Sequence, residues 1–490
     1  MAKEPIVRNK EPILGNSVPA DRQAACAYLR AKHPRFVYES FSWECAGDAL
    51  RASFHFRIDP DIEFAPETII EQIDSKRVQA LPPGVVENLV FHLGLIEMLS
   101  YWKAACSPEI LVRAGSLDSE QIAWWMDLIG HGMGEFFYVN KIDSRAPDFV
   151  RIVAPPNGRK KQVLRSAQDD TAGDRVGARN DLVLTSGGKD SVVTLEFLRE
   201  AGKEFDCLLL NPSDAALGIA RKAGCSAARV VRRAIDPRLL ELNAAGYLNG
   251  HTPFSALLAF LGVTVAALCG WPRVIVSNER SAEEAAAEFL GREVNHQYSK
   301  SFRFENAFRR YSQMVLADSV DYFSLLRPLY ELQIARLFAA YPQYFSLFRS
   351  CNRGMATNSW CGRCPKCLFV FTALYPFIDR EQMLGIFGED LFVWEGAANG
   401  LLTLLGLDRD KPFECVGTKE ETLAALYLCI QKYREQGIEP PAALREIETA
   451  RMASQPDLPQ VARRVLGSWT DQHHLPPELA ELLRKKLIRR

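Results

Sequence analysis

The sequence has almost no net charge. It contains 59 lysines and arginines against 60 aspartates and glutamates in 490 residues, so its formal net charge is −1. Proteins that bind the nucleic-acid backbone usually carry excess positive charge, so the composition argues against nucleic acid as a partner. Hydrophobic residues make up 48% of the chain and charged residues 24%, which excludes a largely disordered protein. A chain of this length predicts two or three domains.

Cysteine is also sparse. Twelve cysteines in 490 residues are too few for a scaffold held together by disulfides. The charged residues that follow Met1 are not succeeded by an apolar stretch, so we expect no signal peptide. A cytoplasmic protein with reduced thiols is the simplest expectation. Four of the cysteines lie within residues 351–367, and we expect the others to be ordinary buried thiols.

Long hydrophobic runs are rare. Residues 254–271 form an 18-residue run without a charge, which reaches the lower limit for a membrane span. The run is interrupted by Gly262 and Gly270, lacks a basic flank before it, and is followed after Pro272 by a strand pattern. A helix buried in an α/β core fits these features better, so we expect no membrane as a partner.

The first third of the chain predicts an α+β domain. Aromatic residues alternate between residues 36 and 58 around a turn at Gly47 and Asp48, as in a β-hairpin. Helical patterns follow at about residues 85–105 and 119–129.

From Leu182 onward, strands and helices alternate. Apolar strands separated by helices indicate a parallel sheet with helices on both faces. The expected strands are residues 182–185, 205–210, 228–232 and 274–277, and the expected helices are residues 192–201, 216–223 and the apolar run. After Cys367 the pattern is mostly helical.

The chain is therefore predicted to be an α/β protein with additional regions on either side. Residues 157–181 hold ten charged residues and no aromatic one, which is typical of a charged linker or insertion. The expected division is an N-terminal α+β domain (1–156), the linker (157–181), a parallel-sheet domain (182–345), a four-cysteine metal knuckle (346–375) and a helical C-terminal region (376–490).

The glycine loop, residues 186–191, lies between the first parallel strand and its helix. Its glycines allow the backbone N–H groups to approach an anion, and the helix N-terminus favours negative charge there. The spacing differs from that of a Walker A motif. The alternative to a phosphate site is a tight turn between strand and helix, in which serine caps the helix. The residues that we expect to bind phosphate are Ser186, Gly187, Gly188, Lys189, Asp190 and Ser191, with Asp190 acting through Mg²⁺ or on loop geometry.

The glycine loop resembles the PP-loop of the N-type ATP pyrophosphatases, a family with an adenine nucleotide alpha hydrolase-like fold. This resemblance implies that ATP is bound with Mg²⁺ and cleaved between its α and β phosphates, so that a substrate becomes adenylated.

Four cysteines predict a metal site. Cys351 is followed by Cys361, Cys364 and Cys367, and two overlapping C-x-x-C units place thiolates within reach of one ion. Zinc in a structural site is the first expectation, while an iron–sulfur cluster or unliganded thiols stay open. Basic neighbours, namely Arg353, Arg363 and Lys366, would offset the charge of the thiolates.

The glycine loop and the cysteine knuckle together resemble two kinds of enzyme, cyano-deazaguanine synthase and the ATP-dependent UDP-N-acetylmuramoyl-L-alanyl-L-glutamate epimerases of some bacteria. Polar stretches at residues 249–254, 277–281 and 294–301 favour the epimerases. The resemblance covers residues 182–370 best. It implies a UDP-linked muramoyl dipeptide as substrate, bound by Asn278, Glu279, Arg280 and Asn295, with His296, Lys300, His251 and Cys415 as candidate catalytic residues.

The chemistry of such an epimerase explains its need for ATP. The α-proton of a glutamate carboxylate is weakly acidic, and adenylation of the carboxylate makes the proton easier to remove. Among the candidate bases we rank His296 first. Arg280, Arg303 and Arg309 are expected either to hold the pyrophosphate or glutamate side chain, or to be surface charges.

The sequence leaves two other enzymatic functions open, together with the oligomeric state, whereas a non-catalytic nucleotide-binding module is the least expected function because the phosphate loop is intact. One is an amide-forming ligase related to cyano-deazaguanine synthase, against which the added N-terminal domain argues. The other is a tRNA-modifying thiolase, which the neutral net charge supports poorly.

Overall fold

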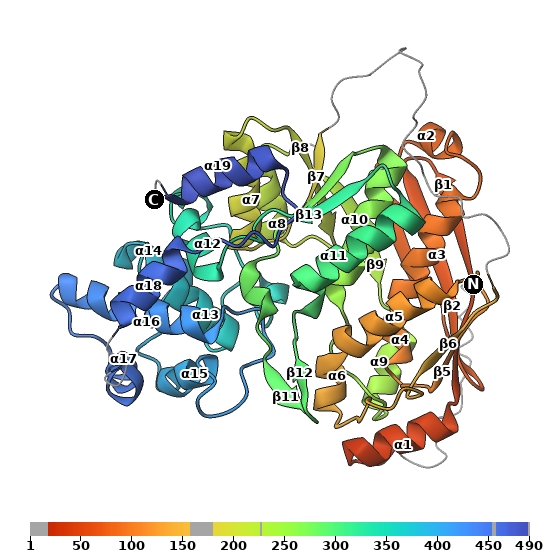
Figure 1. Ribbon diagram of the computed structural model, residues 1–490, viewed down its shortest axis with the longest axis horizontal. Coiled ribbons are helices and arrows are strands. Elements are labelled where there is room, and N and C mark those ends of the chain that lie inside the picture. The colour runs from red at the N-terminus through yellow and green to blue at the C-terminus, as the bar shows by residue number, and fades with distance from the viewer. Residues whose placement is uncertain (1–17, 157–179, 226–227, 453–456, 489–490) are drawn as a thin grey trace, which may run out of the picture.

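The computed structural model describes residues 18–156, 180–225, 228–452 and 457–488 (Figure 1). The predicted linker therefore lies outside the described residues apart from Asn180 and Asp181.

The N-terminal region begins with a hairpin that turns at Gly47, as expected. Gly47 has a φ of 63°, which glycine tolerates because it has no Cβ. The expected helix at 85–105 is divided in two, and the helix at 119–129 continues to Gly132. The elements are α1 (Arg22–Lys32), β1 (Arg35–Ala46), β2 (Ala49–Ile58), β3 (Ile62–Phe64), β4 (Glu67–Glu71), α2 (Ser75–Gln79), α3 (Val85–Glu97), α4 (Leu99–Trp102), β5 (Glu109–Val112), α5 (Ser119–Gly132), α6 (Gly134–Val139) and β6 (Arg151–Val153).

The middle of the chain forms the predicted parallel sheet. Its strands begin and end within a few residues of the expected positions, because apolar runs between glycine-rich turns mark them clearly. The elements are β7 (Asp181–Leu184), α7 (Lys189–Glu200), β8 (Phe205–Leu210), α8 (Asp214–Lys222), β9 (Arg229–Ala234), α9 (Pro237–Ala244), α10 (Phe254–Cys269), β10 (Arg273–Val276), β11 (Ala287–Phe289), β12 (Arg292–Val294), α11 (Phe302–Tyr311), β13 (Asp321–Ser324) and α12 (Glu331–Phe338).

The strand order places the glycine loop at a reversal of the sheet. The parallel strands lie in the order β9-β8-β7-β10-β13, so the chain runs outward from β7 on one side and then crosses to its other side. Open α/β sheets bind ligands at the carboxyl ends of the strands at such a switch point. The glycine loop follows β7, where the switch lies.

One sheet joins the N-terminal and middle regions. β4 pairs antiparallel with β9, and β2, β1, β5 and β6 extend the sheet beyond β4, so that the described residues form an eleven-stranded sheet. The hydrogen-bonded sheet therefore continues across the predicted boundary between the N-terminal domain and the parallel-sheet domain.

Both faces of the parallel strands are covered. Leu182 and Val274 belong to one hydrophobic core, with α3 and α10, whereas Val183 and Ile275 belong to the other, with α7 and α12. The apolar run forms α10, packs against α3 and is buried, which confirms the expectation of a core helix. Among the described residues, no helix is long and apolar enough to cross a membrane.

The C-terminal region is helical, as predicted, and lies across the sheet from the N-terminal strands (Figure 1). It packs on the core that contains α7 and α12. Its helices are α13 (Pro365–Leu374), α14 (Arg380–Phe387), α15 (Ala397–Leu404), α16 (Lys419–Glu435), α17 (Ala442–Ile447), α18 (Leu458–Gly467) and α19 (Pro477–Ile488).

One expectation about the cysteines is wrong. Cys207 on β8 and Cys225 after α8 form a disulfide, although we expected ordinary thiols outside residues 351–367. The β8–α8 unit folds back on itself and brings the two Cα atoms to 6.1 Å, a separation that the sequence pattern does not reveal.

Candidate active site

The glycine loop is closed by its two serines. The Ser186 N–H donates to Ser191 Oγ over 2.9 Å, and the two hydroxyl oxygens lie 3.1 Å apart. Gly187 lies in close contact with Ala215 and Arg349, where a Cβ would come within 2.9 Å of Ala215 Cβ and 3.0 Å of the Arg349 carbonyl oxygen. The loop therefore requires glycine at position 187 for packing reasons alone.

A carboxylate cluster, Asp190, Glu279 and Glu331, lies at the carboxyl ends of β7, β10 and β13. Each residue offers a carboxylate oxygen within 4.8 Å of the other two. Glu279 is only 1% exposed, and among the described residues neither of its carboxylate oxygens accepts a hydrogen bond. A buried carboxylate without hydrogen bonds is costly, so this cluster has the oxygen ligands and the unsatisfied charge that suit a divalent cation.

Lysines surround the carboxylate cluster. Lys189 forms ion pairs with Asp190 and Glu331, and Lys300 Nζ lies 3.7 Å from Glu279 Oε1. Burial and the charge of Asp190 raise the pKa of Glu331 to about 7. Burial opposes the charged form of Lys300, but the surrounding anions raise its pKa and keep it protonated.

A second group of titratable side chains, which we call the His–Cys cluster, consists of Glu135, His251, His296 and Cys415. Glu135 Oε2 lies 2.5 Å from His296 Nδ1 and 3.7 Å from His251 Nδ1, and the two imidazole centroids are 4.5 Å apart. His296 is also hydrogen-bonded to Cys415. The arrangement is a carboxylate that orients a histidine, which in turn contacts a thiol.

The shifted pKa values in the His–Cys cluster favour an ion pair between the Cys415 thiolate and the His296 imidazolium. Burial opposes ionisation of Cys415, but the charge of Lys300 and the hydrogen bond to His296 lower the pKa of its thiol to about 6. Burial would lower the pKa of His296, yet its hydrogen bonds to Cys415 and Glu135 raise the pKa to about 9. Burial and the neighbouring His296 charge lower the pKa of His251 to about 4. At neutral pH the cluster therefore holds a thiolate, an imidazolium and a neutral imidazole.

Lys300 connects the two clusters. Its charge acts on Cys415 as well as on Glu279 and Asp190, so the thiol and the carboxylates lie around one ammonium group. Lys366 also lies between them, since its Nζ donates to the carbonyl oxygen of Cys415 and is 4.0 Å from Glu331 Oε1. The glycine loop and the candidate base therefore belong to one continuous polar site.

The four cysteines of the knuckle, which lie within residues 351–367, bring their thiols together. The Sγ atoms are 3.9 Å apart for Cys351 and Cys364, 3.7 Å for Cys361 and Cys367, and 3.4 Å for Cys364 and Cys367. Sulfurs bound to one tetrahedral zinc at about 2.3 Å are about 3.8 Å from each other. The thiols can therefore hold a single ion, whereas a cluster that binds each thiolate through a different iron needs wider spacing.

Other predicted residues make contacts within the protein. Asn278 donates to Ser324 Oγ over 3.2 Å, and Asn295 donates to the carbonyl oxygen of Ala282 over 2.8 Å. Arg280 donates to Ser468 Oγ over 2.7 Å. Among the remaining arginines, Arg303 pairs with Asp127 and Arg309 pairs with Asp321.

Neither Glu135 nor Glu331 was predicted from the sequence to be a site residue, and Lys366 was predicted to have a different role. Glu331 begins a helix after a parallel strand, a position that the switch-point rule could have indicated. Glu135 lies 161 residues from His296, and no local pattern marks it. Lys366 was expected to offset the thiolates, but its ammonium group instead faces Cys415 and Glu331.

Comparison with known proteins gives a consistent result along the chain. Residues 28–325 match the family model of the MurL N-terminal domain, and residues 347–456 match that of the MurL C-terminal domain. A protein of Xanthomonas oryzae pv. oryzae named UDP-N-acetyl-alpha-D-muramoyl-L-alanyl-L-glutamate epimerase is 36% identical over 406 residues, which cover 81% of this chain and 86% of the relative. A protein of Salinispora tropica with the same name is 38% identical over 404 residues, which cover 80% of this chain and 84% of the relative.

Proposed function

The chain belongs to the MurL family, and from this premise we propose that it inverts the terminal glutamate of UDP-N-acetylmuramoyl-L-alanyl-L-glutamate from the L to the D configuration. The product would serve peptidoglycan precursor synthesis. The match over both domains favours this function over the amide-forming ligase and the tRNA-modifying thiolase, because both matching family models are those of MurL.

We further propose that ATP binds at the glycine loop, which would act as a PP-loop. The position of the loop at the switch point and the charge of Lys189 support phosphate binding there. Asp190, Glu279 and Glu331 would hold Mg²⁺, which supplies charge neutralisation at the phosphates when bound. The cysteine knuckle would hold a structural zinc ion through Cys351, Cys361, Cys364 and Cys367.

ATP is proposed as the co-substrate that activates glutamate. An oxygen of the α-carboxylate attacks the α-phosphorus, the bond to the β-phosphate oxygen breaks, and pyrophosphate leaves. The adenylate no longer carries the carboxylate charge, so the α-proton becomes more acidic. The neighbouring alanyl amide oxygen then attacks the acyl carbon, AMP leaves, the amide nitrogen loses its proton, and an oxazolone forms whose α-proton is more acidic still. A base removes this α-proton, a proton is delivered to the opposite face, and water opens the ring to give the D-glutamate product.

Cys415 is the proposed base, in place of the first-ranked His296. A base must be unprotonated before the proton transfer, and at neutral pH the shifted pKa values make Cys415 a thiolate and His296 an imidazolium. Glu135 orients His296, and Lys300 offsets negative charge between the thiolate and the carboxylates. His251 stays neutral beside His296.

The observation that carries this proposal is that Lys300 lies between the thiol and the carboxylates beside the glycine loop. Incubation with the UDP-linked L-glutamate dipeptide, ATP and Mg²⁺ in deuterium oxide tests it, followed by chiral and mass analysis of glutamate. We expect D-glutamate with deuterium at the α-carbon, together with AMP and pyrophosphate. Epimerisation without AMP formation would contradict the activation step, and no epimerisation would contradict the function.

A further inference from the structure

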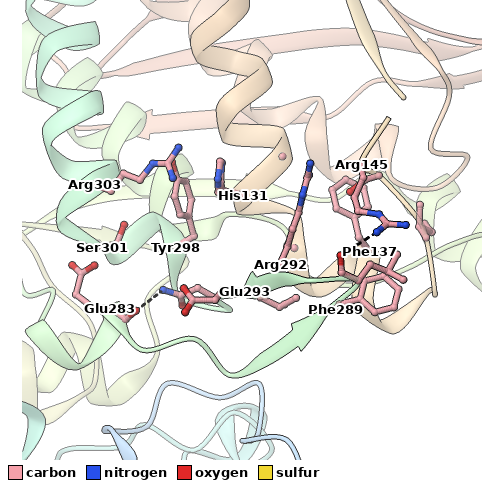
Figure 2. A pocket seen from close by; sticks show the side chains of 17 residues that line it. His131, Phe137, Arg145, Glu283, Phe289, Arg292, Glu293, Tyr298, Ser301 and Arg303 are labelled. Atoms are coloured by element: carbon pink, nitrogen blue, oxygen red, sulfur yellow. Dashed lines mark hydrogen bonds between the residues drawn. The ribbon is translucent and has the colours of Figure 1, made fainter. Parts of the chain in front are cut away.

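A cavity of about 580 Å³ lies beside the His–Cys cluster, between the β11–β12 hairpin and helices α5 and α6 (Figure 2). This volume is in the range of small-molecule sites. None of its lining residues belongs to the glycine loop or to the carboxylate cluster. The cavity is therefore a separate compartment from the proposed ATP site.

The cavity and the His–Cys cluster share a wall, residues 295–301. Three i to i+3 hydrogen bonds link residues 295 to 298, 297 to 300 and 298 to 301, as in a 3₁₀-helix with three residues per turn. With this period Asn295, Tyr298 and Ser301 fall on one face, and these residues line the cavity. His296 and Lys300 lie on the other faces, where they join the polar site.

A second wall, at the start of α6, also separates the cavity from the His–Cys cluster. Gly134 lines the cavity, and the next residue, Glu135, is the carboxylate that contacts His296. A ligand in the cavity therefore lies one wall away from the residues proposed to invert glutamate.

Arginines make the cavity suitable for phosphate. The guanidinium groups of Arg145, Arg292 and Arg303 border it, and such groups bind phosphate oxygens in a fork. Arg145 is held by Asp143 and Arg303 by Asp127, whereas Arg292 forms no salt bridge or hydrogen bond through its guanidinium with any described residue.

Acidic residues balance the formal charge of these arginines, but they leave Arg292 unpaired among the described residues. Glu283, at the left of Figure 2, is paired with Arg327 at 2.7 Å, and Glu293 lines the cavity without a salt bridge to Arg292. Flat rings are also present, because Phe289 lines the cavity and the His131 ring stacks on Tyr298 with centroids 5.1 Å apart. Aromatic faces next to arginines are a combination that suits a base and its phosphates.

We propose that this cavity binds the uridine diphosphate end of the substrate, with Arg292 as the main ligand of the diphosphate. The inference rests on the proposed function for the identity of the ligand. The muramoyl sugar and the alanyl residue would pass around residues 295–301, so that the glutamate reaches the His–Cys cluster while the nucleotide stays in the cavity.

Calorimetric titration of the full-length protein with UDP tests the site. Arg292→Ala should weaken UDP binding about tenfold, because a charge-assisted contact to phosphate is lost. Arg145→Ala should weaken it less, since Asp143 already engages that guanidinium. The control Arg232→Ala removes an arginine that is 59% exposed and paired with Glu71 on β4, away from the cavity, and should not change the affinity. Asp190→Ala should also leave it unchanged, because UDP would not occupy the glycine loop.

Kinetics separate this inference from the proposed function. Arg292→Ala should raise KM for the UDP-linked dipeptide about tenfold with little change in kcat, and should not affect turnover of the same dipeptide without UDP. If the wild-type protein epimerises the substrate but Arg292→Ala alters neither KM nor UDP affinity, the cavity assignment is wrong and the function stands. Arg292-dependent UDP binding without any epimerisation would instead support the cavity and contradict the function.

Discussion

The backbone N–H of Arg349 donates a 2.6 Å hydrogen bond to the carbonyl oxygen of Gly187. Arg349 lies two residues before Cys351, so the segment that leads to the first knuckle cysteine is bonded directly to the glycine loop. A change in the knuckle can therefore reach the proposed ATP site through one backbone contact.

Replacement of Gly187 by alanine should disturb this contact. The added Cβ would lie 3.0 Å from the Arg349 carbonyl oxygen and 2.9 Å from Ala215 Cβ, so the backbone must shift. We expect the free energy of unfolding to fall by about 1–3 kcal/mol, as for other overpacked sites. Gly188→Ala is the matched control, because the nearest atom that its Cβ would meet among the described residues is Ser350 Cβ at 3.7 Å. Equal effects of the two variants in chemical denaturation would contradict the packing argument.

Loss of the knuckle metal should affect both stability and ATP binding. Cys364→Ser removes one thiolate, and we expect metal content to fall from about one zinc ion per chain, with a loss of more than about 3 kcal/mol in unfolding free energy. Elemental analysis and ATP titration measure the two effects. Cys45→Ser is the control, since Cys45 lies outside the knuckle. Iron with visible absorbance in the wild-type protein would assign the site to iron instead.

The dependence of kcat/KM on pH should be bell-shaped. The thiolate of Cys415 forms above about pH 6, so kcat/KM should rise with pH through that value, and the imidazolium of His296 is lost above about pH 9, so the rate should then fall. Cys415→Ser should lower kcat by about 10²–10⁴, because a serine hydroxyl does not ionise in this range. A Cys415→Ser enzyme with normal turnover would exclude the thiol as the base.

Glu135→Gln should shift the alkaline limb of this profile to lower pH. The substitution keeps the shape of the side chain but removes the charge that helps to raise the pKa of His296. The paired histidine has a folded-state pKa above its ordinary value of 6.5, so the pairing stabilises the fold below about pH 6.5 and this contribution is lost as the pH rises through about 9. NMR titration of the histidines and denaturation at several pH values measure both effects. Glu71→Gln, on β4, should change neither.

Glu279→Gln should raise the Mg²⁺ concentration needed for half-maximal activity by about tenfold or more. The neutral amide is a poorer ligand for a hard cation than the buried carboxylate. Glu305→Gln provides a matched control, because Glu305 is also 1% exposed but lies on α11 outside the carboxylate cluster. An unchanged Mg²⁺ requirement in Glu279→Gln would remove this residue from the proposed magnesium site.

Local patterns in the sequence determined the elements of the site. The strand, glycine loop and helix around residues 181–200 could be predicted because apolar periodicity and paired glycines act over a few residues. The spacing of the knuckle cysteines likewise predicted that their thiols meet, and the glycine interruptions of residues 254–271 favoured the buried helix α10.

Only the tertiary structure decided which side chains meet. Glu135 reaches His296 across 161 residues, and Glu331 reaches Lys189 across 142, because α6 packs beside the β11–β12 hairpin and β13 joins the sheet next to β10. The selection of Cys415 over His296 as the proposed base depends on the same contacts, since Lys300 and Glu135 shift the two pKa values in opposite directions. Such contacts follow from strand order and packing over the whole chain, and a charge interacts with its spatial neighbours whatever their distance in sequence.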